Sequence, residues 1–133
     1  MNQIIIDATD GILGRVAAYA AKQVLLGKEV RIVNCNDALI TGSKKMISSK
    51  YKRARRRGGS SLRGPNFPKS PERIMKRTIR GMLPYKKGRG ADAFKKIKCY
   101  NSLPAEFESS EKTSLKSEIK FKAIKLSKLE GEL

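Results

Sequence analysis

The first 33 residues follow a strand–helix–strand pattern, which restricts the fold more than any other feature. Ile4 to Ile6 lie in a β-branched run that we interpret as a buried strand over Asn2–Asp7. Apolar residues then recur at helical spacing from Ile12 to Leu26, and Gly27 stands where a helix commonly ends. Glu29–Val33 predicts a second strand. Two strands joined through a helix of roughly 15 residues form a βαβ unit, so we expect an α/β fold with a parallel sheet.

The passage from the first strand into the first helix contains two features that need interpretation. Asp10 is placed to cap the helix with its carboxylate. Gly11 and Gly14 form a GxxG motif, a spacing that occurs in the phosphate-clamping loop of the KH domain but is common by chance. We favour a local role, in which these glycines allow a tight entry into the helix.

Residues 44–98 carry the whole net charge of the chain. This window contains 20 lysines and arginines and two acids, Glu72 and Asp92, whereas the rest has ten basic and ten acidic residues. The formal charge of +18 therefore arises from one section attached to a neutral body. Like charges gathered in this way repel one another, so the section requires a polyanion as its partner. Nucleic acid fits best, because lysine and arginine neutralise phosphates and release their counterions.

Within this window the pattern predicts two helices joined by an arm. Ser43 is a suitable cap for a basic helix over Lys44–Arg57. Residues 58–70 are rich in Gly, Ser and Pro and predict a loop or extended segment, so the basic arm covers 51–70. Ser70-Pro71-Glu72 then provides a cap, a proline at the first helical position and an acid in the first turn. These signals predict a helix that continues to about Leu83.

The second of these helices is amphipathic. At about 100° per residue, its apolar side consists of Ile74, Met75, Thr78, Ile79, Met82 and Leu83. The opposite side consists of Arg73, Lys76, Arg77 and Arg80. We expect the first side to pack on the sheet and the second to face outward.

The remaining segments are shorter. Tyr85–Gly90 predicts a basic loop, Asp92–Ile97 a short helix and Lys98–Asn101 a last strand. Beyond Pro104 the composition changes, first to Glu and Ser and then to Lys alternating with apolar residues. We interpret 105–133 as a C-terminal tail or extension that orders only against a partner.

The cationic clusters are the candidate sites of nucleic-acid contact. Tyr51–Arg57 has five cations in seven residues and no acid, and the planar fork of its arginines suits phosphate and base edges. In the loop after the second helix, glycines let the backbone approach phosphate, and Tyr85 either stacks on an unpaired base or packs within the protein. The predicted RNA-binding residues are Arg15, Lys44, Lys45, Lys52, Arg53, Arg55, Arg56, Arg57, Arg63, Arg73, Lys76, Arg77, Arg80, Tyr85, Lys86, Lys87 and Arg89.

The sequence offers little for catalysis or for a cofactor. It has no histidine, and therefore no histidine base or metal ligand. Cys35 and Cys99 lack metal-ligand spacing, and we expect free thiols. Asp7, Asp10 and Asp37 are a conceivable acid–base or Mg²⁺ set in an enzyme that acts on RNA, but turn and cap roles explain them better. We expect no enzyme activity, no metal, no cofactor and no small-molecule substrate.

Membrane insertion and secretion are not expected either. No apolar run approaches the ~20 residues that span a bilayer. The first residues lack the basic and apolar regions of a secretory signal.

Three sequence blocks together match a known pattern. They are Ile6-Asp7-Ala8 with Leu13-Gly14-Arg15-Val16-Ala17; Val33-Asn34-Cys35 through Ile40-Thr41-Gly42; and Pro71-Glu72-Arg73-Ile74 running into Arg80-Gly81-Met82-Leu83-Pro84. Over roughly residues 3–104 they resemble the universal ribosomal protein L13 family of the large subunit. Tyr51–Arg57 and Pro84-Tyr85-Lys86 resemble its archaeal and eukaryotic branch. Cys35 departs from the usual alanine.

The resemblance implies a three-layer α/β/α fold with a small, mostly parallel four-stranded sheet plus basic extensions, in a domain over 1–104. It also implies a structural role in the large subunit of the cytoplasmic ribosome, with contacts to large-subunit ribosomal RNA and to neighbouring ribosomal proteins, and early entry into assembly. The alternatives are an mRNA-binding repressor of translation outside the ribosome and a DNA-binding architectural protein. No helix-turn-helix or zinc-finger spacing supports the DNA-binding alternative.

Overall fold

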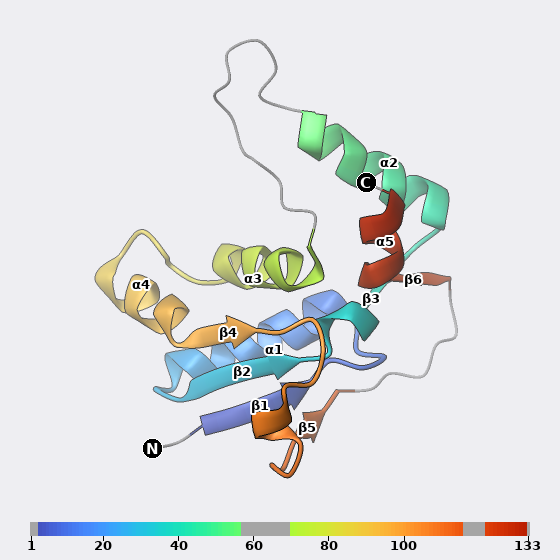
Figure 1. The fold of residues 1–133 in the computed structure, drawn as a ribbon. Helices are drawn as coiled ribbons and strands as arrows, with labels where there is room; N and C mark the ends of the chain where they lie inside the picture. Colours follow the sequence, from blue (N-terminus) through green and yellow to red (C-terminus); the bar gives the residue numbers. More distant parts are fainter. Residues whose placement is uncertain (1–2, 57–69, 116–121, 133) are drawn as a thin grey trace.

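A computed structural model of the chain describes residues 3–56, 70–115 and 122–132 (Figure 1). Its helices and strands, in chain order, are β1 (Gln3–Asp7), α1 (Leu13–Leu25), β2 (Glu29–Val33), the 3₁₀-helix η1 (Cys35–Asp37), β3 (Leu39–Thr41), α2 (Lys44–Arg56), α3 (Pro71–Gly81), α4 (Gly88–Lys95), β4 (Ile97–Cys99), the 3₁₀-helix η2 (Ala105–Phe107), β5 (Thr113–Ser114), β6 (Ala123–Lys125) and α5 (Leu126–Glu132). Within the described ranges, no helix combines the length and the apolar character needed to cross a membrane.

The centre of the protein is a four-stranded sheet in the order β4-β2-β1-β5. All three neighbouring pairs are parallel, and the β1–β2 ladder runs from Gln3 opposite Glu29 to Asp7 opposite Val33. The βαβ unit expected from the sequence pattern and the mostly parallel four-stranded sheet implied by the family resemblance are therefore confirmed. A second, two-stranded sheet pairs β3 with β6 in antiparallel fashion. Strand β3 is a short segment that the sequence pattern assigns neither to a strand nor to a helix.

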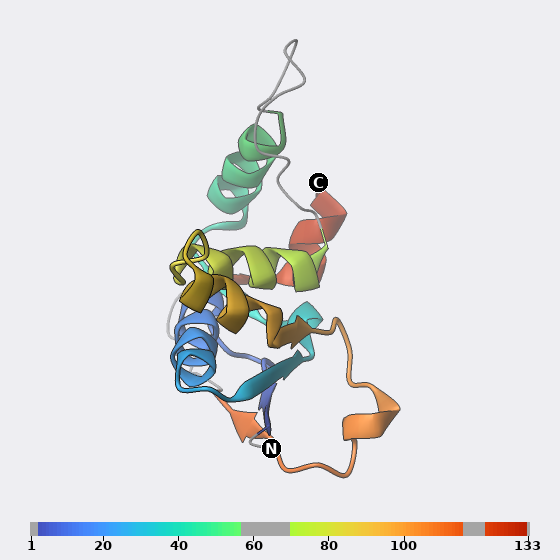
Figure 2. The same ribbon diagram turned by 90° about the vertical axis from the view of Figure 1, so that its left-hand side faces the viewer.

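The two faces of the large sheet are covered differently. Helices α1, α3 and α4 pack together on one face, where Ile6, Val30 and Ile32 enter the main core. On the other face, Phe107 of η2 packs with Ile5 and Val33. Figure 2 shows α1 and η2 on opposite sides of the strands. The sheet thus lies between two layers, as the three-layer α/β expectation requires, although the second layer is thin.

The turn between β1 and α1 corrects one expectation. Helix α1 begins after Ile12 without a side-chain cap, so Asp10 is not the cap. Asp10 instead adopts a left-handed backbone conformation (φ 57°), and its N–H donates to the carbonyl of Asp37. Gly11 is needed for close packing here, because a Cβ at this position would lie 2.7 Å from the Val16 side chain. Gly27 has a φ of 93°, which confirms the predicted helix stop.

The segment between α3 and β4 also differs from the prediction. Helix α4 begins at Gly88, earlier than the expected Asp92, and β4 begins at Ile97, one residue before the expected Lys98; two further strands follow it among the described residues. Gly90 is buried within α4, and a Cβ there would overlap the carbonyl oxygen of Pro84. This glycine therefore serves the packing of α4 against the preceding turn and not a loop that approaches phosphate.

The C-terminal segment departs most from the prediction. Its described residues are part of the body: β5 extends the large sheet, and β6 pairs with β3. Leu126 and Leu129 of α5 are fully buried in the main core. For these elements the interpretation as a tail that orders only against a partner is wrong, because the fold supplies strand edges and an apolar surface for them. In Figure 1, α5 lies between α2 and α3.

Candidate nucleic-acid-binding surface

Helix α3 joins the core to a cationic outer face. Ile74, Met75 and Ile79 are almost completely buried, as the sequence periodicity predicts. On the other side of α3, Arg73 is exposed, whereas Lys76, Arg77 and Arg80 are half-buried. One exception is Met82, expected on the apolar side but 43% exposed. The helix ends at Gly81, so Met82 leaves the helical register, and the following turn buries Leu83 in its place.

Aromatic rings hold two of the half-buried cations in place. The ammonium nitrogen of Lys76 lies 5.1 Å from the centroid of the Phe94 ring on α4. The guanidinium carbon of Arg80 lies 5.0 Å from the centroid of the Tyr85 ring. Such cation–π contacts orient a side chain without neutralising it. Tyr85 packs on Arg80 but remains 39% exposed, so it combines an intramolecular contact with a ring surface open to a ligand.

The start of α3 is fixed by a residue from a distant part of the chain. Ser70 occupies the cap position, as predicted, but its side chain makes no capping hydrogen bond. The N–H of Glu72 instead donates to the side-chain oxygen of Asn101 at 2.9 Å, and the Asn101 amide donates to the Ser70 hydroxyl at 3.4 Å. Asn101 therefore ties the first turn of α3 to the segment that follows β4.

The described side chains of α2 that anchor it to the body lie between Ile47 and Tyr51. The predicted cap is present, because the N–H of Met46 donates to the Ser43 hydroxyl at 3.3 Å. Ile47 is buried and Tyr51 half-buried, and burial raises the pKa of the Tyr51 hydroxyl above its ordinary value. Beyond this point Lys52 and Arg53 are exposed. Both views show α2 projecting away from the sheet and α3 (Figures 1 and 2).

The remaining predicted cations have three different placements. Exposed side chains of the described residues are those of Arg15 in the first turn of α1, Lys44 and Lys45 in α2, Lys86 and Lys87 in the turn, and Arg89 in α4. Arg55 and Arg56 belong to α2, but their side chains lie outside the described part of the protein. Arg57 and Arg63 lie outside the described residues altogether. The structure thus brings the α3 and turn cations together and carries those of α2 away from the body.

The acids considered as a catalytic set serve the turns. Asp7 Oδ1 accepts hydrogen bonds from the Thr9 N–H at 3.0 Å, the Thr9 hydroxyl at 2.7 Å and the Asn34 amide at 3.1 Å. Burial alone raises the pKa of Asp7, but these hydrogen bonds outweigh it and lower that pKa below its ordinary value. Asp37 forms an ion pair of 3.7 Å with Lys125. Among the described residues, no group of three acidic, cysteine or histidine side chains is arranged to hold a metal ion.

The two cysteines are free thiols. Cys35 is fully buried and Cys99 half-buried. A hydrogen bond with the Cys99 side chain, together with burial, raises the pKa of the Cys35 thiol far above its ordinary value. Cys35 is therefore protonated and acts as a small apolar core residue.

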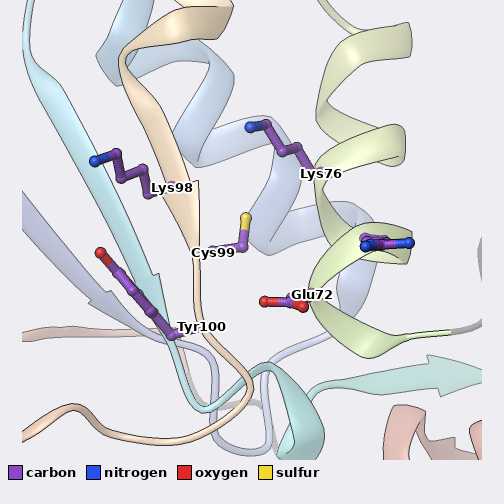
Figure 3. A pocket seen from close by; sticks show the side chains of 6 residues that line it. Glu72, Lys76, Lys98, Cys99 and Tyr100 are labelled. Carbon is purple, nitrogen blue, oxygen red and sulfur yellow. The ribbon is translucent and has the colours of Figure 1, made fainter.

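A pocket between α3 and β4 contains residues that sequence reasoning does not group together. It has a volume of about 330 Å³ and is lined by Glu72, Arg73, Lys76, Lys98, Cys99 and Tyr100 (Figure 3). Arg73 and Lys76 belong to the predicted set, but the other four do not. The sequence signal that could have pointed to these residues is the alternation of side chains along a strand. It places the Cys99 side chain on the face toward α3 and the side chains of Lys98 and Tyr100 on the opposite face (Figure 3).

Comparisons with known proteins agree on one family. The family model described as ribosomal protein L13 matches residues 1–106. The large ribosomal subunit protein uL13 of Methanosarcina barkeri is 49% identical over 108 residues, which cover 80% of this chain and 76% of that protein. The protein of the same name from Natronomonas pharaonis is 46% identical over 124 residues, covering 91% of this chain and 85% of that protein. The one from Archaeoglobus fulgidus is 45% identical over 107 residues, 80% of this chain and 68% of that protein.

Proposed function

This chain belongs to the ribosomal protein L13 family, and we propose that it is a structural constituent of the large ribosomal subunit in the cytoplasm. The observation that carries this proposal within the chain itself is the segregation of charge. The whole net charge of +18 lies in residues 44–98, and the described cations of this window are exposed or half-buried on α2, α3, the turn after α3, α4 and β4. A field of this size suits the phosphates of a large folded RNA.

The finer part of the proposal is that large-subunit ribosomal RNA binds these outer faces. The α/β body provides a rigid base, and α3 presents Arg73, Arg77 and Arg80 about one turn apart. Arg80 is oriented by its contact with the Tyr85 ring, whose exposed part is available to a base or a ribose. Helix α2 projects away from the sheet and exposes Lys52 and Arg53 (Figures 1 and 2), and the sequence continues with further cations at Arg55–Arg57. RNA is recognised here through its shape, its phosphates and its 2′-hydroxyls more than through base sequence.

This arrangement suits a protein that supports early assembly of the subunit. The body folds on its own core, whereas α2 extends exposed cations such as Lys52 and Arg53 that are available to RNA as it folds. A patch that makes about 6–10 phosphate contacts loses affinity steeply with salt, so neighbouring ribosomal proteins are expected to contribute to retention in the finished particle.

The proposal is tested by sedimentation of an extract from cells that produce the tagged full-length chain. We expect the protein to migrate with the large subunit and to remain there after washing at high salt. The control is a tagged neutral protein of similar size, which should stay at the top of the gradient. Recovery of the chain in a chromatin fraction, or in the free pool only, contradicts the proposal.

A further inference from the structure

The pocket between α3 and β4 has the features of a nucleotide site. Its volume of about 330 Å³ lies at the lower end of the roughly 300–1,000 Å³ of small-ligand pockets, which is large enough for one nucleotide but not for a helix. It is located at the outer edge of the sheet, because β4 is the terminal strand. From this position a ligand attached to a longer polymer can enter from solvent.

Two cations of the pocket, Arg73 and Lys76, come from helix α3. Arg73 and Lys76 are three residues apart on α3 and therefore lie on the same side of the helix. Lys76 is held over the Phe94 ring, and Arg73 is exposed. Together they offer charge-assisted donors to one phosphate group.

Glu72 is unexpected at such a place. It is one of only two acids in the basic window, and Figure 3 shows its carboxylate pointing from α3 toward Cys99 on β4. Within the described residues, no lysine or arginine lies within ion-pairing distance of this carboxylate. Its hydrogen bond from the Ser70 hydroxyl is long, at 3.5 Å. An acid that is not ion-paired with the described cations around it retains capacity to accept hydrogen bonds from a ligand.

The backbone at Glu72 is tied to the segment that follows β4. The Glu72 N–H is bound at 2.9 Å to Asn101, just beyond β4, so the helix and the strand cannot separate independently. Lys98 and Tyr100 lie on the other side of the strand from Cys99 and form the rim (Figure 3). The first turn of α3, which carries Glu72 and Arg73, is therefore held beside the edge strand β4.

We propose that this pocket binds one unstacked guanine nucleotide of the bound RNA, with its phosphate on Arg73 and Lys76 and its base donating to Glu72. Guanine presents two adjacent donors, N1–H and the N2 amino group, which match the two oxygens of a carboxylate. Uracil presents one N–H between two carbonyl oxygens, which a carboxylate repels. Adenine and cytosine place a ring acceptor beside their amino group. The inference rests on the proposed function, because the RNA supplies the nucleotide.

The test uses the isolated full-length chain and free nucleotides as probes. Guanosine 5′-monophosphate, uridine 5′-monophosphate and inorganic phosphate are titrated into ¹⁵N-labelled protein at constant ionic strength, and amide shifts are followed by NMR. We expect saturable shifts around Glu72 and Lys98–Tyr100, with the guanine nucleotide binding about ten times more tightly than the uridine nucleotide. Equal affinities for the two nucleotides, or shifts confined to α2 and the turn after α3, overturn the inference.

Two variants separate the contributions of base and phosphate. Glu72→Gln should remove the preference for guanine and leave phosphate binding in place, whereas Arg73→Ala should weaken both nucleotides to a similar extent. Lys22→Ala, on exposed α1 and outside the pocket, is the matched control and should change neither affinity. An unchanged guanine preference in Glu72→Gln with a native-like spectrum contradicts the assignment.

The two proposals fail in different ways. A chain that sediments with the large subunit but binds both nucleotides equally retains its ribosomal role and lacks the guanine site. A chain that prefers guanine but never enters the subunit contradicts the proposed function and leaves a free-nucleotide site.

Discussion

Helices α2 and α3 are both strongly basic, but they are attached to the protein in different ways. Helix α3 buries Ile74, Met75 and Ile79 in the main core and exposes its cations on the opposite side. Among the described side chains of α2, burial is confined to Ile47 and Ser48, with Tyr51 half-buried, and its later residues Lys52 and Arg53 are exposed. The difference indicates that α3 stabilises the fold as well as carrying cations, whereas α2 mainly extends the proposed RNA-binding surface.

The largest effect is expected from a charge placed on the buried side of α3. Ile79→Asp should unfold the protein, because an ionised carboxylate without a partner would enter the core at a cost of several kcal/mol. The comparison is Met46→Asp in α2, where the native side chain is 74% exposed and little change is expected. Urea unfolding followed by circular dichroism measures both. A native-like midpoint for Ile79→Asp would contradict the face assignment of α3.

The converse experiment changes only the far end of α2. Simultaneous reversal of Arg55, Arg56 and Arg57 to Glu should strongly reduce incorporation into the large subunit and leave the unfolding midpoint near that of the native protein. The reason is that these residues follow the exposed Lys52 and Arg53 in the sequence, and we propose that they contact RNA phosphates. Gradient profiles and thermal melts are compared with those of Lys22→Glu/Lys28→Glu/Lys128→Glu, which reverses three charges outside the basic window. Normal incorporation of the arginine variant would exclude a role for this cluster.

A third prediction concerns α5, which contacts both α2 and α3. Leu129 is fully buried in the main core, so Leu129→Ala should lower the free energy of unfolding by about 2–5 kcal/mol. Lys128→Ala, at the neighbouring exposed position, is the control. Denaturant titrations of the two variants measure the free energy of unfolding of each. Equal stability of both would show that α5 is an appendage and not part of the body.

The smallest effect is expected from pH and involves Asp7 in the neutral body. Its folded-state pKa is lowered from the ordinary 3.8 by hydrogen bonds from Thr9 and Asn34, so its contribution is present above about pH 4 and is lost as pH falls through the folded pKa. Asp7→Asn should therefore be modestly less stable at neutral pH. The same variant should also lose less stability than the native protein between pH 5 and pH 3. Unfolding curves of both proteins at pH 5 and pH 3 test this prediction. Equal losses of stability in the two proteins would contradict the role given to Asp7.

The sequence predicts those helices and strands in which apolar residues recur at regular spacing over several positions. The βαβ unit and the buried side of α3 follow from residues such as Ile6, Val30 and Ile79, which recur with the spacing of strands and helices. The start of α4 was misplaced because Gly88 and Gly90 indicate a loop, whereas Gly90 is required by its contact with Pro84. Strands β5 and β6 have two or three residues and show no periodicity, so their pairing depends on tertiary structure alone.

The candidate site likewise contains residues that the sequence predicts and residues that it does not. The cations of the basic window could be identified from composition, and the outward placement of Arg73 follows from helical geometry. The pocket could not be identified, because it requires α3 and β4 to be held together by Asn101, a residue 29 positions after Glu72. The aromatic partner of Lys76 was likewise unpredictable, since Phe94 approaches from another helix.

The most direct measurement is a comparison of lysine reactivity in the free protein and in purified large subunits that contain it. An amine-modifying reagent and mass spectrometry report the exposure of each lysine. Lys45, Lys52, Lys86 and Lys87, all exposed in the protein alone, should become protected in the particle, whereas Lys22 and Lys128 should keep their reactivity. If the first four lysines react in the subunit as they do in the free protein, the basic faces are turned toward solvent and do not bind ribosomal RNA.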